Sequence, residues 1–278
     1  MFATHLYAIA PVELRRQLLD RTYNAFSVHC PIFPLAAKLQ QLDVEVQVHP
    51  LTGPDRGVHL VNHEIERVGL QGAALPILQS TGVIAVDGNK RTRFPGMFDP
   101  ADGGSGWTPY ADGVHVLVAS PDDEASTLQA ALDRLPANTI YVPQQSLGLD
   151  FYDHQKLFKS AAAVVCDEDH LAEMVKQSDP VAALTDLLDR GVLAPVVALG
   201  RDRNWSAIAG QTRTTLAAEV SPQDRLARLL ALVAERIGDG QVLNAALLAA
   251  LLELDNAAVP EAVGVAGSFL AAVNALWS

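Results

Sequence analysis

The chain has 278 residues, of which 49% are hydrophobic, and its 20 basic and 32 acidic residues give a formal net charge of −12. This composition supplies a core and excludes a disordered chain, and the lack of a basic stripe excludes nucleic acid as a partner. The apolar runs are shorter than the ~20 residues of a membrane span, and two widely separated cysteines fit a reducing compartment. We therefore expect a cytoplasmic protein that does not bind a membrane.

The first predicted elements alternate between helix and strand. Residues 34–42 and 57–70 have the spacing of amphipathic helices, and residues 44–51 between them alternate as a strand does. Residues 82–94 predict a hairpin because Asp87 and Gly88 supply the chemistry of a tight turn. A loop rich in glycine, proline and aspartate follows at 95–113.

Short apolar strands separated by helices follow in the middle of the chain. The strands are predicted at 114–120, 139–143, 162–166 and 194–200, and the helices at 124–135, 153–161, 169–177 and 180–191. Such unbroken apolar strands indicate a parallel sheet with both faces covered. The C-terminal third predicts three helices, at 221–237, 242–253 and 259–277. In the second of these, Leu243, Leu247, Ala250 and Leu251 are spaced as one buried face. We expect one α/β domain, 1–278, with a projection near 83–113.

A glycine-rich turn, Gly238-Asp239-Gly240-Gln241, opens directly into the apolar helix that follows it. A helix N-terminus offers bare backbone N–H groups and a positive dipole end, which together attract a phosphate. We therefore expect the N–H groups of Gly240 and Gln241 to be unpaired and to face a cleft. In the alternative interpretation, the glycines only let the chain turn and the Asp239 side chain caps the helix.

The order of these features resembles the ribokinase-like (PfkB) carbohydrate kinases over roughly residues 28–278. The segment "PLAAKLQQLDVEVQVHPLTGPDRG" is similar to that family's early helix, strand and glycine–aspartate turn, and "VIAVDGNKRTRF" to its lid hairpin. "AAAVVCDEDHLAEM" stands where the family has Asn-x-x-Glu, and "APVVALGRDRNWSAIAG" resembles its nucleotide-side strand. "GDGQVLNAALLAALLE" resembles the GAGD anion-hole turn and its helix.

The resemblance implies a three-layer sandwich with a mostly parallel central sheet and a small β lid, which in this chain is expected to be a reduced lid near 83–113. It implies ATP-dependent phosphoryl transfer to a hydroxyl of a small-molecule sugar or nucleoside, with ATP and Mg²⁺ as cofactors, and it allows for a homodimer. In such chemistry, backbone donors stabilise the charge on the phosphate while a base removes the hydroxyl proton.

Carried onto this chain, the family's motifs give a set of expected site residues. Gln241 takes the position of the catalytic aspartate, with Asp239 as a displaced base, and Gly238 and Gly240 form the anion hole. Because glutamine cannot accept a proton at neutral pH, the resemblance implies weak catalysis. The remaining assignments are nucleotide binding at Gly200 and Asp202 and a metal site at Glu168 and Asp169.

Several motif positions differ from the family. His29, Cys30 and Pro34 replace its sugar-contacting Gly-Gly and Asn, and residues 1–26 show no clear counterpart of its opening strand. The helix at 221–237 is expected to be an insertion. A competing alignment instead places Asp224 of "SPQD" on the catalytic position, at a suitable distance from Gly200. Two functions remain open, a divergent kinase and an inactive homologue that serves as a ligand-binding or protein-interaction module.

Overall fold

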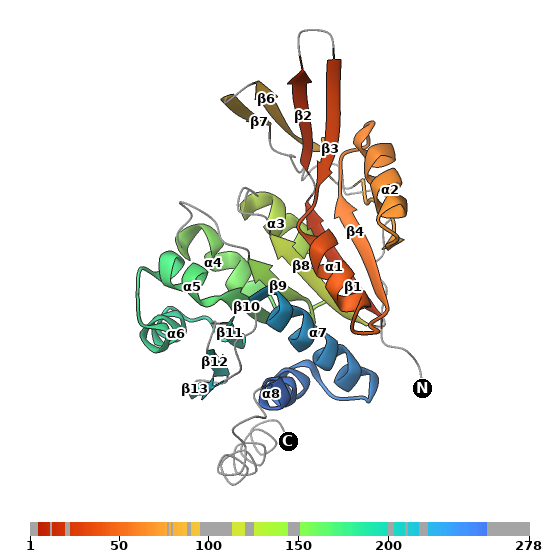
Figure 1. Cartoon of the computed structure of the whole chain (residues 1–278). Helices are drawn as coiled ribbons and strands as arrows, with labels where there is room; N and C mark the ends of the chain where they lie inside the picture. Colours follow the sequence, from red (N-terminus) through yellow and green to blue (C-terminus); the bar gives the residue numbers. More distant parts are fainter. Residues whose placement is uncertain are drawn as a thin grey trace.

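The largest feature of the computed structural model is a sheet that extends, strand beside strand, through the main body of the molecule (Figure 1). The structure describes residues 5–11, 13–19, 23–76, 78, 80–87, 90–94, 113–119, 125–143, 151–199, 203–208, 211–216 and 222–254. Within these ranges the sheet has nine strands in the order β13-β12-β11-β10-β9-β8-β1-β4-β5. A separate sheet has four strands in the order β3-β2-β6-β7.

The large sheet is parallel from β5 through β11, and its last two strands, β12 and β13, are antiparallel. Its strands span β1 (Leu6–Pro11), β4 (Val46–Leu51), β5 (Gln71–Gly72), β8 (Val114–Ala119), β9 (Ile140–Pro143), β10 (Ala163–Asp167), β11 (Val196–Leu199), β12 (Arg203–Ile208) and β13 (Gln211–Leu216). Every residue of β8, β9 and β11 is buried, as expected for parallel strands covered on both faces.

Helices pack on both faces of this sheet. One face carries α1 (Ile32–Gln40), α2 (Gly57–Arg67), α7 (Pro222–Gly238) and α8 (Leu243–Leu254). The other carries α3 (Ala125–Leu132), α4 (Phe151–Ser160), α5 (Glu168–Val175) and α6 (Pro180–Asp189). Alternate residues of β1 and β8 enter the two separate apolar clusters, because successive strand side chains point to opposite faces. The predicted fold class is therefore confirmed.

The small sheet projects from the end of the large one and forms the lid (Figure 1). Its strands are β2 (Glu13–Leu19), β3 (Tyr23–His29), β6 (Gly82–Asp87) and β7 (Lys90–Phe94). The antiparallel pair β6–β7 confirms the predicted hairpin. The prediction of a reduced lid was wrong, because β2 and β3 double the lid, and their many polar residues gave no clear alternation in the sequence. Of the loop predicted at 95–113, only Gly113 lies within the described residues.

The prediction that residues 1–26 contain no opening strand was also wrong. β1 is an interior strand of the large sheet, third from the β5 edge, and pairs in parallel with β4 on one side and β8 on the other. Its described residues Leu6, Ala8, Ile9 and Ala10 are fully buried. Its buried residues form a short unbroken apolar run, which by itself does not distinguish a strand from a buried helix, so only the pairing with its neighbours identifies it as an interior strand.

Helix α7 runs from the carboxyl edge of the large sheet back towards the amino edge. Leu199, at the end of β11, pairs with Asn204 of β12. Asn204 in turn pairs with Thr215, near the end of β13. β13 therefore also ends at the carboxyl edge. Only residues 217–221 separate β13 from α7. Towards its other end, the helix lines the same cavity as residues 42–45, which directly precede β4. The helix that was expected to be an insertion is thus part of the core, packed on α1, β8 and β11.

Candidate functional site

The first turn of α7 brings two charged residues from distant parts of the chain together. Asp224 lies in this turn, and its Oδ1 accepts a hydrogen bond from the Nζ of Lys38 in the last turn of α1. The Lys38 side chain is 29% exposed and that of Asp224 is 43% exposed, so the ion pair is partly screened from water. The next residue, Arg225, is only 2% exposed, which places a second cation in the same turn.

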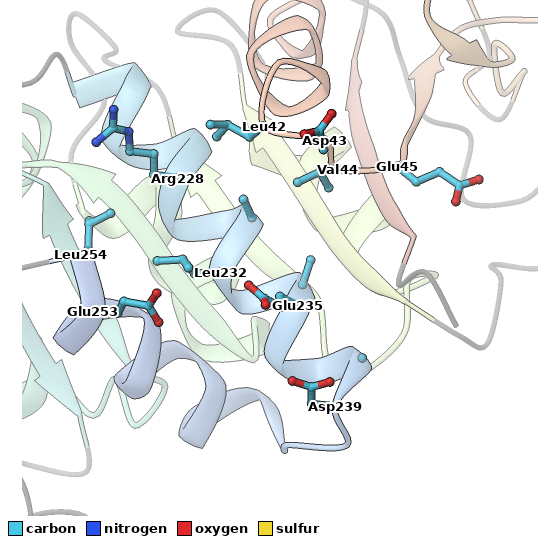
Figure 2. A pocket seen from close by; sticks show the side chains of 13 residues that line it. Leu42, Asp43, Val44, Glu45, Arg228, Leu232, Glu235, Asp239, Glu253 and Leu254 are labelled. Carbon is cyan, nitrogen blue, oxygen red and sulfur yellow. The ribbon is translucent and has the colours of Figure 1, made fainter. Parts of the chain in front are cut away.

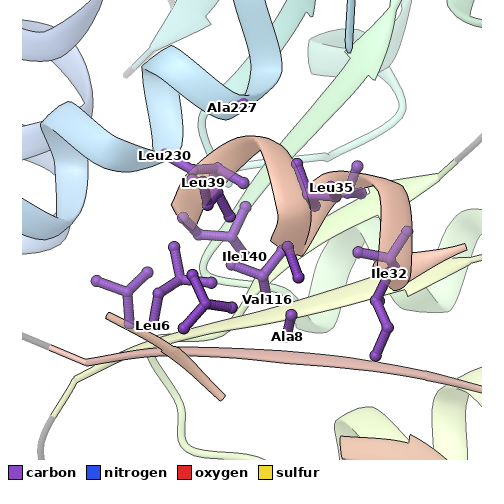
Figure 3. Close-up of a cluster of buried hydrophobic side chains, with 14 of the residues drawn as sticks. Leu6, Ala8, Ile32, Leu35, Leu39, Val116, Ile140, Ala227 and Leu230 are labelled. Atoms are coloured by element: carbon purple, nitrogen blue, oxygen red, sulfur yellow. The ribbon is translucent and has the colours of Figure 1, made fainter. Parts of the chain in front are cut away.

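Apolar packing fixes the two helices that carry this ion pair. Leu35 and Leu39 of α1 and Ala227 and Leu230 of α7 are buried in one apolar cluster (Figure 3). These residues lie at spacings of three and four, so they form one face of each helix. Because Lys38 adjoins Leu39 on α1 and Asp224 lies three residues before Ala227, the same packing holds their backbones opposite one another.

The glycine turn lies at the other end of α7, where it closes that helix. The backbone N–H of Gly240 donates to the carbonyl of Ile237 at 2.9 Å, and the N–H of Gln241 donates to that of Arg236 at 3.0 Å. Gly240 adopts a φ of 88°, which is the left-handed conformation common after helix C-termini. The expectation that these two N–H groups are unpaired was therefore wrong, because carbonyl groups in the last turn of α7 accept hydrogen bonds from both of them.

The surroundings of this turn are acidic. Gly238 and Asp239 line a cavity of about 1050 Å³ between α7, α8 and the loop before β4, to which Arg228 contributes a cation. The cavity is also lined by five carboxylates, which Figure 2 shows on several elements: Asp43, Glu45, Glu235, Asp239 and Glu253. Such a lining repels a phosphate, and the cavity lies at the amino edge of the sheet. Ligands of open α/β sheets bind outside the carboxyl ends of the strands.

The helix after the glycine turn agrees with the prediction. α8 begins at Leu243 and ends at Leu254, against a predicted end near residue 253. Leu247, Ala250 and Leu251 are buried as expected, and Leu243 is partly buried. The N-terminal turn of α8 and residues 238–241 are therefore placed by packing of an apolar helix. Gly238, Asp239, Gly240 and Gln241 themselves are exposed.

The residues predicted to bind metal lie at the carboxyl edge. Glu168 and Asp169 form the first turn of α5, directly after β10. The Asp167 carboxylate accepts from the N–H groups of Asp169 at 2.9 Å and His170 at 3.4 Å, so it caps the helix. Among the described residues there is no group of three metal-ligating side chains. The residues predicted to bind the nucleotide, Gly200 and Asp202, lie outside the described ranges.

The glycine–aspartate turn after β4 ties the lid to the large sheet. The Asp55 carboxylate accepts from the N–H and the Oγ1 of Thr81, both at 2.8 Å, and from the N–H of Gly57 at 2.7 Å. Thr81 directly precedes the lid strand β6. Burial would raise the pKa of Asp55, but the hydrogen bonds from Thr81 and Gly57 outweigh it and lower the pKa. The turn therefore fixes one of the points where the lid joins the sheet.

The three positions expected to contact a sugar flank the junction of lid and large sheet. His29 ends β3 and is exposed, Cys30 is 4% exposed, and Pro34 is exposed in the first turn of α1. The sequence reasoning missed Lys38 entirely and gave Asp224 only as the competing alignment. The spacing of Asp224 from Gly200 was the one signal for it, whereas an ion pair across 186 residues leaves no local signal.

Neither a protein-family model nor a curated protein matches the sequence. Solved structures do match it. Aminoimidazole riboside kinase from Salmonella enterica, complexed with aminoimidazole riboside and an ATP analog, is 12% identical, with a TM-score of 0.58 over 90% of this chain and 91% of that one. Fructokinase from Vibrio cholerae O395 in apo form is 11% identical, with a TM-score of 0.56 over 91% and 96% of the two chains.

A third match is a pyrophosphate-dependent kinase in the ribokinase family, complexed with a pyrophosphate analog and myo-inositol. It is 12% identical, with a TM-score of 0.53 over 88% of this chain and 92% of that one. At these identities the likeness concerns the fold, and the chain has the fold of the ribokinase-like sugar kinases. In the part of the chain that the structure describes, no helix is both long and apolar enough to cross a membrane.

Proposed function

We propose that this protein transfers a phosphoryl group to a hydroxyl of a small sugar-like or nucleoside-like molecule, at the carboxyl edge of the large sheet and beneath the lid. The observation that carries the proposal is the position of Asp224, a partly buried carboxylate in the first turn of a 17-residue helix that begins next to this edge. A carboxylate there can accept the hydroxyl proton while the helix dipole favours the negative phosphate.

Asp224 thus takes the role that the sequence alone assigned to Gln241. The exposed turn around Gln241 has its N–H groups committed to α7 and adjoins several carboxylates, so it suits a structural role. At the start of α7, by contrast, Lys38 of α1 pairs with the proposed base, and Arg225 follows that base in the same turn. This assignment follows the competing alignment, in which Val220-Ser221-Pro222-Gln223 replaces the glycines of the family turn.

The phosphate donor is proposed to be ATP or pyrophosphate, since the similar kinases were solved with analogs of each. Mg²⁺ binds through one or two carboxylates together with water and substrate phosphates, and Glu168 and Asp169 supply two such groups at the same edge. Mg²⁺ would neutralise charge on the donor phosphates. The weak catalysis expected from the sequence has a different cause here, because Pro222 has no N–H to offer a phosphate.

An inactive, ligand-binding homologue is the second candidate, favoured by the same loss of glycines before Asp224. Calorimetry with ATP and with pyrophosphate, each with Mg²⁺, separates binding from chemistry. Phosphorus NMR of the purified protein with sugars, inositol and nucleosides then tests transfer. We expect binding of one donor and slow transfer to at least one acceptor. Binding without any transfer selects the second candidate, and no binding of either donor contradicts both.

A further inference from the structure

The ion pair between Lys38 and Asp224 connects α1 to α7 at the start of the proposed catalytic helix. The two residues are 186 positions apart in the sequence, so the contact exists only because the fold brings the two helices together. Both side chains are partly exposed. Ion pairs of this exposure contribute little to stability, so a stabilising role alone is a weak explanation for the contact.

The geometry of α1 directs the Lys38 side chain towards the start of α7. Long side chains on a helix point back towards its N-terminus, and Lys38 lies in the last turn of α1. The N-terminus of α1 follows the lid strand β3 directly, so this direction is also that of the lid. The ammonium therefore lies on the lid side of the Lys38 backbone, where it meets the Asp224 carboxylate.

We propose that Lys38 is a positioning residue for the reaction, which holds the Asp224 carboxylate in one orientation at the start of α7. This inference rests on the proposed function. In the reaction, the proton of the acceptor hydroxyl passes to Asp224 as the new O–P bond forms. The bond between the transferred phosphorus and the leaving oxygen breaks, and its electrons remain on ADP or phosphate. Because the base must lie close to the hydroxyl, a carboxylate that rotates freely slows this step.

The test compares Lys38→Met with Lys38→Arg in steady-state assays with the best donor and acceptor. Methionine keeps most of the apolar stem and loses the charge, whereas arginine keeps both the charge and the hydrogen bond. We expect K38M to lower kcat roughly 10- to 100-fold with little change in KM for the acceptor. K38R should restore most of the rate. Lys159→Met, on the exposed surface of α4, serves as the matched control and should keep the full rate.

A second experiment combines Lys38→Met with Asp224→Asn in one protein. If Lys38 acts through Asp224, K38M should cause no further loss of rate in the D224N background, because the effects of residues that act together are not additive. A kcat for K38M that is unchanged or raised, or full additivity with D224N, overturns the role of Lys38 and leaves the proposed function intact. No transfer by the unmodified protein overturns the proposed function, and the positioning role with it.

Discussion

The two ends of α7 differ in every property that matters for binding a phosphate. The N-terminal end begins next to the carboxyl edge of the sheet, is partly buried, and combines Asp224 with Lys38 and Arg225. The C-terminal end lies at the amino edge, is exposed, and adjoins a cavity rich in carboxylates. The glycine turn that resembles an anion hole lies at this C-terminal end, where its N–H groups donate hydrogen bonds to the last carbonyl groups of α7.

A glycine turn in front of a helix therefore has two meanings that the residues of the turn alone do not separate. The same glycines serve a phosphate-binding turn and the left-handed residue after a helix C-terminus, because both need a conformation that other residues avoid. What separates them is whether the preceding segment is a strand or a helix. Here the preceding segment is α7, which ends at Gly238.

The largest expected effect is at the N-terminal end of α7. Asp224→Asn keeps the size of the side chain and removes its ability to accept a proton at neutral pH. We expect the transfer rate to fall by roughly 10²- to 10⁴-fold, the usual contribution of general-base catalysis. Steady-state kinetics with the best acceptor measures the loss, and calorimetry with the donor checks that binding survives.

The matched control for this prediction is Asp239→Asn at the C-terminal end. It makes the same chemical change in the exposed turn and should leave the transfer rate unchanged. A large loss of rate in D239N with normal activity in D224N would reverse the assignment of the two ends.

Residues at the amino edge should instead affect the stability of the folded protein. The strongest effect is expected from His115, near the start of β8. Its ring is 1% exposed and stacks on Tyr7, with ring centroids 4.9 Å apart, and neither ring nitrogen has a hydrogen-bond partner within the described residues. Burial, together with the charge of His49, lowers the pKa of His115 from 6.5 to about 4. The unfolded chain therefore binds a proton between these pH values that the folded protein does not bind.

The direction in which stability changes with pH follows from this difference in proton binding. The free energy of unfolding should fall as the pH drops through 6.5, by roughly 3 kcal/mol in total, and should level off near pH 4. Urea unfolding at a series of pH values measures the curve. In His115→Leu the curve should be shallower over this interval, and identical curves for the two proteins would show that His115 is not responsible.

A smaller effect is expected from Gly240→Ala in the glycine turn. An added Cβ meets no atom within 4 Å, so the cost comes only from the φ of 88°. We expect a loss of about 1 kcal/mol in unfolding free energy, which is the usual penalty for a side chain in the left-handed region. The transfer rate should stay unchanged. A loss of donor binding in calorimetry would instead support an anion site at this turn.

The smallest effect is expected from Gln241→Asp, which restores the residue of the family motif at the C-terminal end. Because the proposed base is Asp224, this substitution should not raise the transfer rate. The new carboxylate lies just before α8 and should stabilise the protein by only ~0.3–1 kcal/mol through the helix dipole. A clear increase in transfer rate would show that the turn is the catalytic one.

The sequence by itself determined the layered α/β fold, the lid hairpin at β6–β7 and the apolar helix α8. Each of these depends on a periodic pattern or a turn within a few residues, which the chain carries locally. Leu247, Ala250 and Leu251, for example, are spaced as one helical face whatever surrounds them.

Only the tertiary structure decided the position of the site. β1 became recognisable as a central strand through its pairing with β4 and β8, and the lid doubled through the pairing of β2 with β6. Asp224 and Lys38 form an ion pair although 186 positions separate them in the sequence. The N–H groups of Gly240 and Gln241 donate hydrogen bonds to carbonyl groups of the preceding helix. Such contacts depend on which edge of the sheet a segment reaches. Strand order and helix direction determine that edge, and short sequence motifs do not encode either of them.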